Sequence, residues 1–245
     1  MKAVEVQRCA RVALEKCACT RPGERVLVVT DTMRDQSVAQ ALVGAAMALG
    51  CEAVLAVIPT RRLTPQEPPA SVVAAMQATD VVFLYTTYSL SHSNARVQAQ
   101  KAGARIISMP GVTEDGFLRT MSVEMDRLAS LTNRLADRVA RARTARVLTA
   151  LGTDMRYELG HPVTAIDGVC QKPGEIDFFP PGLFLSVPQE ASATGTAVVD
   201  GAITQIGRLA SPVTMTFVKG CLDKIAGGGE ATRLEQLLAS LEDDN

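Results

Sequence analysis

The sequence predicts an α/β protein with an open, doubly wound, mainly parallel sheet followed by a β-rich α+β region. Between residues 23 and 110, apolar runs of strand length alternate with helical stretches, which is typical of successive βαβ units. A long amphipathic pattern follows from Met121 to Arg143. After residue 146 the chain changes to short β-like pieces broken by Gly and Pro. We therefore expect two domains, residues 1–145 with the long connecting helix and residues 146–245.

The elements of the first domain are expected in regular order. An N-terminal helix, with apolar residues at near-helical spacing, ends at Arg21-Pro22-Gly23. The expected strands cover residues 26–30, 53–58, 81–85 and 105–109, and the helices between them cover residues 37–49, 71–78 and 93–102. Ligands usually bind beyond the carboxyl ends of such strands, so the polar residues that follow each strand are candidates for a site.

The second domain is expected to contain short strands and one closing helix. The strands are predicted at residues 147–151, 184–187, 196–199 and 213–218, and the helix at residues 231–241. Gly227-Gly228-Gly229 separates the last strand from this helix.

Composition narrows the function classes. Lys plus Arg number 25 against 26 Asp plus Glu, so no net charge attracts nucleic acid or anionic lipid. No signal peptide pattern is visible, and no apolar run approaches the ~20 residues of a membrane span. The six cysteines lack the CxxC spacing of zinc sites, which favours free thiols in a reducing compartment. We expect a cytoplasmic homo-oligomer that binds a small molecule, and neither nucleic acid nor a membrane.

Candidate site residues follow the third predicted strand. The sheet is Rossmann-like in architecture, but no GxGxxG or GxxxxGK[ST] motif is present, so a dinucleotide or P-loop nucleotide site is not expected. Thr86 and Thr87 lie at the end of this strand, and His92 follows in a polar stretch where an imidazole could act as general acid or base. The alternative is a helix-capping or solvent-exposed histidine. His161 lies in a turn-like segment and is interpreted as a surface residue.

The second domain offers further polar candidates. Asp154 and Arg156 follow the predicted strand 147–151, where they could form a charge pair that orients a ligand, or could cap a turn. Glu175 and Glu190 lie in turns with Pro or Gly and could face a metal or be solvated. With two histidines and no compact motif such as HExxH, the chain is poorly supplied with ligands for a catalytic metal.

Several segments, taken in order, carry a family resemblance. They include Ser91-His92-Ser93-Asn94-Ala95-Arg96, Met109-Pro110-Gly111-Val112 with Arg119-Thr120-Met121, Gly152-Thr153-Asp154-Met155, and Phe179-Pro180-Pro181-Gly182. Together they resemble the superfamily of aminopeptidase T-like metallo-aminopeptidases and 2,5-dihydroxypyridine 5,6-dioxygenases. The resemblance covers nearly the whole chain.

The resemblance implies a divalent metal, Fe(II) or Zn(II)/Co(II), and a small aromatic, hydroxypyridine-like or amide-bearing substrate. The peptidases place a metal-binding Glu after the Pro-Gly pair, whereas this chain has Leu183, which favours ring-opening dioxygenase chemistry over a metallo-aminopeptidase. We assign catalytic roles to His92, Asp154 and Glu190, with His92 as acid or base. We assign substrate binding to Thr86, Thr87, Arg119, Thr153 and Arg156.

One departure from the family limits these assignments. Family members continue with a segment that carries His and His-x-Asp metal ligands, whereas this sequence stops at Asn245, so the second domain is expected to be incomplete and no metal ligands are assigned. A truncated enzyme and a non-catalytic small-molecule-binding scaffold are both consistent with this departure.

Overall fold

The computed structural model describes residues 2–61 and 66–240. The chain divides into two compact units, of which the first contains Met1–Leu135 and Ala165–Phe184 and the second contains Ala136–Thr164 and Leu185–Asn245. Within the described residues, no helix is both long and apolar enough to cross a membrane.

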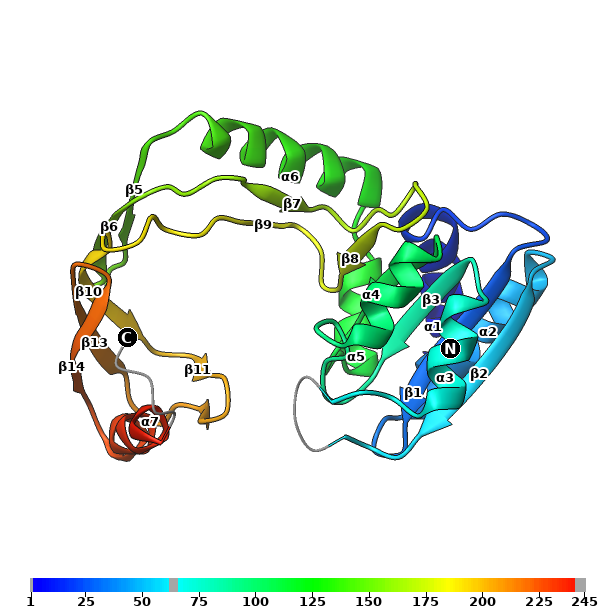
Figure 1. The fold of residues 1–245 in the computed structure, drawn as a ribbon, viewed down its shortest axis with the longest axis horizontal. Helices are drawn as coiled ribbons and strands as arrows, with labels where there is room; N and C mark the ends of the chain where they lie inside the picture. Colours follow the sequence, from blue (N-terminus) through cyan, green and yellow to red (C-terminus); the bar gives the residue numbers. More distant parts are fainter. Residues whose placement is uncertain (1, 62–65, 241–245) are drawn as a thin grey trace. The chain divides into compact units, whose positions relative to one another are not determined.

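The first unit is built on a parallel sheet, as predicted. Its strand order is β2-β1-β3-β4-β8, and every neighbouring pair is parallel. Figure 1 labels β1, β2, β3 and β8 of this sheet. The strands are β1 (Arg25–Asp31), β2 (Glu52–Ile58), β3 (Val81–Tyr85), β4 (Arg105–Ser108) and β8 (Ile176–Phe178). The α/β fold class with a Rossmann-like sheet is therefore confirmed.

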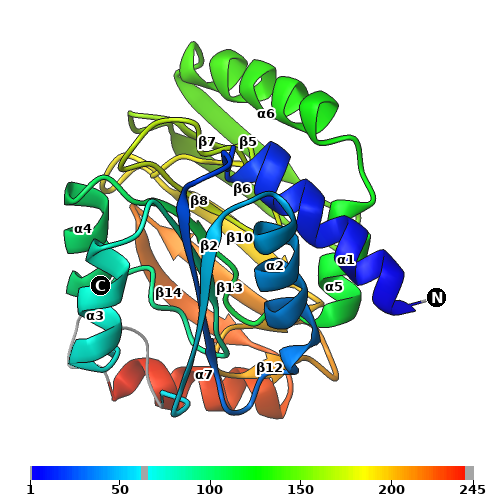
Figure 2. The ribbon, with the colours of Figure 1, turned by 90° about the vertical axis from the view of Figure 1, so that its right-hand side faces the viewer.

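Helices cover both faces of this sheet because successive strand residues point to opposite sides. Val26 and Val28 pack in one core, and Leu27 and Val29 in another. The first core contains residues of α1 (Lys2–Val12), its π-helical continuation Ala13–Cys17, α2 (Gln36–Ala48) and α5 (Glu114–Met121). The second contains residues of α3 (Ala70–Gln77) and α4 (Asn94–Lys101), which lie across the sheet from α1 and α2 (Figure 2).

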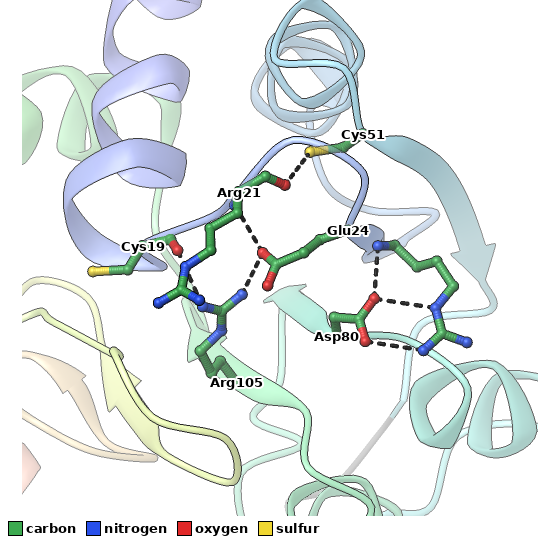
Figure 3. A network of polar contacts seen from close by, with 7 residues as sticks. Cys19, Arg21, Glu24, Cys51, Asp80 and Arg105 are labelled. Carbon is green, nitrogen blue, oxygen red and sulfur yellow. Dashed lines mark hydrogen bonds and ion pairs between the residues drawn. The ribbon is translucent and has the colours of Figure 1, made fainter.

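An ion pair between a buried arginine and a partly buried glutamate joins the amino ends of the strands (Figure 3). The Arg105 side chain is 5% exposed, and its guanidinium donates to the Glu24 carboxylate at 2.5 Å and to the Cys19 carbonyl at 3.0 Å. Nearby, Arg25 binds Asp80 through a more exposed pair at 2.9 Å. These contacts join the starts of β1, β3 and β4 at the edge opposite the one where ligands bind in such sheets.

The connecting region differs from the prediction. The long helix expected from Met121 to Arg143 is α6 (Met125–Ala140), and the separate helix α5 precedes it. Thr113 caps α5 by accepting the Gly116 N–H at 3.0 Å. A Thr ahead of a polar turn is an N-cap signal, but from the sequence the polar residues after the strand 105–109 are interpreted only as candidates for a site.

The second unit contains an antiparallel sheet with strand order β14-β13-β10-β6-β5. Its strands are β5 (Thr144–Leu148), β6 (Asp154–Glu158), β10 (Thr194–Val199), β13 (Val213–Val218) and β14 (Cys221–Ala226). A hairpin of β11 (Ala202–Ile203) and β12 (Gly207–Arg208) and the helix α7 (Gly229–Ala239) complete the second unit. A separate pair, β7 (Thr164–Ile166) and β9 (Leu183–Leu185), has most of its residues in the first unit. A β-rich region does follow the parallel sheet.

The two units are not continuous in sequence, unlike the expected division at residue 145. β8 joins the first sheet beside β4, with Ile106 opposite Ile176 and Ile107 opposite Asp177. This pairing satisfies backbone groups along the outer edge of β4. A strand of three residues carries too little pattern to be recognised in the sequence.

Candidate functional site

The carboxyl edge of the parallel sheet is organised around Asp31, at the end of β1. The chain runs from β1 to β2 on one side and later to β3 on the other, so the point where the strand order reverses lies at Asp31. The carboxylate is 1% exposed. Its Oδ1 accepts bonds from the Thr60 hydroxyl (2.9 Å), the Thr87 hydroxyl (2.9 Å) and the Met33 N–H (3.0 Å), and its Oδ2 accepts the Thr87 N–H (2.5 Å).

These bonds determine the charge and the role of Asp31. Burial opposes ionisation, but the hydrogen bonds from Thr87, Met33 and Thr60 outweigh it and lower the pKa of the Asp31 carboxyl. Because the carboxylate already accepts four bonds, it ties together the loops after β1, β2 and β3. We interpret it as a structural residue of this edge.

The two threonines predicted to bind substrate make contacts inside the first unit. The Thr87 hydroxyl and N–H both bind Asp31. The Thr86 hydroxyl donates to the Tyr88 carbonyl at 2.7 Å. Both hydroxyls shape the loop after β3, and substrate binding by them stays a prediction.

His92 follows this loop as an exposed side chain between two anchored serines. The Ser91 hydroxyl lies 2.6 Å from that of Ser108, and Ser93 caps α4 by accepting the Arg96 N–H at 3.2 Å. The cap is therefore Ser93 and not His92. Among the described residues, the imidazole has no hydrogen-bond or ion-pair partner. A fixed backbone with a free imidazole suits proton transfer.

Arg119 lies apart from these residues, on the exposed surface of α5. Its guanidinium pairs with Asp115 at 2.7 Å, and both side chains are more than two-thirds exposed. This contact is the ordinary pairing of residues one helical turn apart.

The antiparallel sheet separates the polar candidates of the second unit. Successive residues of β6 point to opposite faces, so Asp154 and Arg156 share one face while Met155 and Tyr157 share the other. Asp154 accepts two bonds from the Arg146 guanidinium, at 2.8 and 2.7 Å. The bonds from Arg146 lower the pKa of the Asp154 carboxyl. The ion pair considered from the sequence joins Asp154 to Arg156. In the structure Asp154 instead pairs with Arg146, which lies opposite Arg156 in the register of β5 and β6.

A groove of about 800 Å³ lies on the other face of this sheet. Thr153 and Glu190, two of the predicted site residues, line it. The Thr153 hydroxyl is engaged within the sheet, since it accepts the Val198 N–H at 2.9 Å. Further lining residues, which the sequence interpretation did not single out, are Met155, Tyr157, Phe217, Lys219 and Cys221. The alternation along β6 could have indicated Met155 and Tyr157, but only the strand register brings Phe217 beside them.

The described residues do not provide a metal site. Across residues 2–61 and 66–240, no group of three or more His, Cys, Asp or Glu side chains could hold a metal ion. Asp154 and Glu190 do not converge, because Asp154 points away from the groove. The side chains of the described residues therefore do not fit a catalytic metal.

Comparison with known proteins places this geometry in a family. The family described as NicX, 2,5-dihydroxypyridine 5,6-dioxygenase, matches residues 5–245. A 2,5-dihydroxypyridine 5,6-dioxygenase of Pseudomonas putida strain KT2440 is 29% identical over 178 residues, which cover 69% of this chain and 48% of that protein. The chain thus spans about half the length of this curated relative.

Two solved structures share the fold. The structure of 2,5-dihydroxypyridine dioxygenase from Pseudomonas putida KT2440 has a TM-score of 0.80 and 23% identity over 99% of this chain and 73% of that one. Wild-type AmpT from Thermus thermophilus has a TM-score of 0.56 and 14% identity over 98% of this chain and 75% of that one. The predicted resemblance is confirmed, and the chain belongs to the NicX, or 2,5-dihydroxypyridine 5,6-dioxygenase, family.

Proposed function

We propose that the protein is a ring-opening dioxygenase for a hydroxypyridine-like compound. The observation that carries this proposal is the family match over residues 5–245, nearly the whole sequence. The curated relative that supports it is named for the same chemistry. Because the chain spans 48% of that relative, the activity of the whole relative is carried over as a proposal.

His92 is our candidate for proton transfer in this reaction. Loss of a proton from a ring hydroxyl makes the ring richer in electrons, and imidazole is the side chain best suited to exchange protons near neutral pH. His92 is exposed, while Ser91 and Ser93 hold its backbone in place. Asp154, Arg146 and Arg119 already form ion pairs, so they are weaker candidates for direct contact with substrate.

The metal-dependent part of the proposal needs ligands beyond those described. A divalent metal, Fe(II) for a dioxygenase, supplies open positions for O₂ and substrate oxygens in such chemistry. No group of ligands within residues 2–61 and 66–240 fits it. We therefore propose that any metal ligands come from outside the described residues or from another chain. Because no group of ligands within the described residues fits a metal, our second candidate function is a non-catalytic scaffold that binds a small molecule.

Leu183 favours dioxygenase over aminopeptidase chemistry. At the position where the resemblance implies a metal-binding Glu in the peptidases, this chain has an apolar side chain that is 41% exposed. The likeness to AmpT supports the fold alone. Three further proposals are that the protein binds a small molecule, forms a homo-oligomer and is cytoplasmic. Light scattering of the purified protein tests the homo-oligomer.

The function is tested by oxygen consumption. The purified chain is loaded anaerobically with Fe(II), its metal content is measured, and O₂ uptake is followed on adding 2,5-dihydroxypyridine. We expect uptake that matches substrate loss, and a decrease of about 10²- to 10⁴-fold in turnover for His92→Ala with metal content unchanged. The other histidine of the chain supplies the control, since His161→Ala should retain turnover.

Three outcomes contradict parts of this proposal. Stoichiometric Fe(II) without O₂ uptake would reject the dioxygenase assignment. Chelator-sensitive hydrolysis of Leu-p-nitroanilide would show a peptidase instead. Substrate binding by an intact fold that takes up no metal would favour the scaffold.

A further inference from the structure

One face of the sheet in the second unit is apolar, and within this unit the helix α7 packs against one end of it. Cross-strand pairing places Met155 and Phe217 opposite Gly195, and Ala197 opposite Met215, so these residues share a face. At one end of this face, Met215 packs with Val213 and with the helix α7. At the other end lies the groove of about 800 Å³, lined by Met155, Tyr157, Ala197 and Phe217. An apolar, partly aromatic surface of this kind is typical of a binding site.

Two tight turns form a polar wall of this groove. Lys219 and Ala191 have left-handed backbones, with φ of 49° and 60°, which is uncommon for residues other than Gly. The turns touch, because a Cβ on Gly220 would lie 3.1 Å from the Ala191 nitrogen and Cα, and the Gly220 N–H donates to the Ala193 carbonyl at 2.7 Å. Strained backbone concentrates at sites where side chains are held in position for a ligand.

Opposite charges lie on these two turns without neutralising each other. Glu190 precedes Ala191, Lys219 precedes Gly220, and both side chains line the groove. Within the described part of the chain, neither takes part in an ion pair. A carboxylate and an ammonium are therefore both available to a bound molecule beside an aromatic surface.

We propose that this groove binds a flat, hydroxylated aromatic ring. The ring lies against Phe217, Tyr157 and the Met155 thioether, which are contacts that aromatic ligands favour. Lys219 donates to a ring oxygen, and Glu190 accepts a hydroxyl or ring N–H proton. The proposal rests on the proposed function, since a hydroxypyridine offers a flat ring, an oxygen that accepts a hydrogen bond, and a hydroxyl or ring N–H that donates one. The groove is made by the second unit alone, whereas His92 belongs to the first, so the binding proposed here does not include proton transfer by His92.

A single tryptophan can report on this groove because the chain contains none. The tryptophan fluorescence of the Phe217→Trp variant is followed while 2,5-dihydroxypyridine is added in the absence of metal and O₂. Catechol and unsubstituted pyridine are added in parallel experiments. We expect saturable quenching by the hydroxylated rings and little by pyridine. Met47→Trp, on the exposed side of α2, controls for absorption by the ligand and should not saturate.

The polar contact is tested in the same reporter. Adding Lys219→Met should weaken binding at least ~10-fold, the usual effect of removing one charge-assisted hydrogen bond. Lys224→Met, a lysine on β14 that does not line the groove, should leave affinity unchanged. In the unaltered chain, the backbone amide NMR signals of Ala193 and Gly220 should shift on adding ligand, which detects the site even if Phe217→Trp disturbs the fold.

The outcomes separate this inference from the proposed function. Binding of catechol but not of 2,5-dihydroxypyridine, with the Lys219 effect, would support the groove and reject the proposed substrate. Binding of 2,5-dihydroxypyridine without the Lys219 effect and without shifts at the turns would reject the groove alone. If no ring binds, the inference is overturned. A reporter signal that instead depends on protein concentration would identify the face as a contact between copies.

Discussion

Asp177, on β8, is a carboxylic acid buried in the first unit without a cation to pair with in the described part of the chain. It is 5% exposed. Burial raises the pKa of Asp177 from its ordinary value of 3.8 to about 7, although the N–H groups of Phe178 and Gly168 donate to its carboxylate and act in the opposite direction. The neighbouring Cys17 and Cys170 thiols are themselves buried and offer no positive charge.

This shift links the stability of the first unit to pH. Below pH 3.8 both the folded and the unfolded states hold the proton, so Asp177 adds no pH dependence there. Between 3.8 and about 7 the unfolded chain loses the proton while the folded chain keeps it, so the free energy of unfolding falls as pH rises. One pKa unit corresponds to about 1.4 kcal/mol, which gives a decrease of at most about 4 kcal/mol across this window.

Asp177→Asn removes this dependence and keeps the shape of the side chain. We expect the free energy of unfolding of the variant, minus that of the wild type, to rise by up to about 4 kcal/mol between pH 4 and pH 8. Any constant cost of the amide cancels in this comparison. Urea denaturation across the pH range measures it, with Met47→Trp in both proteins as a probe of the first unit, since the two units can unfold separately. A difference that does not change with pH would refute the reasoning.

Three further predictions concern stability and reactivity. Arg105→Met should lower the free energy of unfolding by about 3–5 kcal/mol, because it leaves the partly buried Glu24 carboxylate without its ion-pair partner. Arg25→Met breaks a half-exposed pair and should lower it much less. Equal urea midpoints for the two variants would contradict this. Gly195→Ala should destabilise the second unit by at least about 2 kcal/mol, because the added Cβ would lie 2.1 Å from the Asp154 carbonyl oxygen. Gly201→Ala is the control, since a Cβ there meets open space. Thermal melts compare the unfolding midpoints of the two variants. Cys221 should react with a thiol reagent in the native protein, whereas the buried thiols of Cys9, Cys17, Cys51 and Cys170 should react only on unfolding. Rapid reaction of three or more thiols in the native protein, which is more than Cys221 and the half-buried Cys19 can supply, would refute this.

The sequence by itself determined the parallel sheet and its helices. Runs such as 26–30 and 81–85 are apolar without interruption because both faces of each strand are buried, and this local pattern is visible without knowing the partners. Several short sequence segments between Ser91 and Gly182, taken in their order along the chain, likewise identified the superfamily, which the family match confirms.

Only the tertiary structure decided which polar residues meet. Asp31, Thr60 and Thr87 are far apart in sequence, and their contacts exist because three parallel strands end at one edge. The membership of β8 in the first sheet depends on pairing with β4, to which it is not adjacent in the chain.

The candidate site shows the same division. The sequence could place His92 after a strand, but only the structure shows its imidazole exposed while Ser93 caps the helix. In the second unit, strand register turns Asp154 to one face and joins Tyr157 to Phe217 on the other. Register is a property of two strands together, and a shift of one residue would exchange the faces. The chemistry available on each face therefore cannot be assigned from either strand alone.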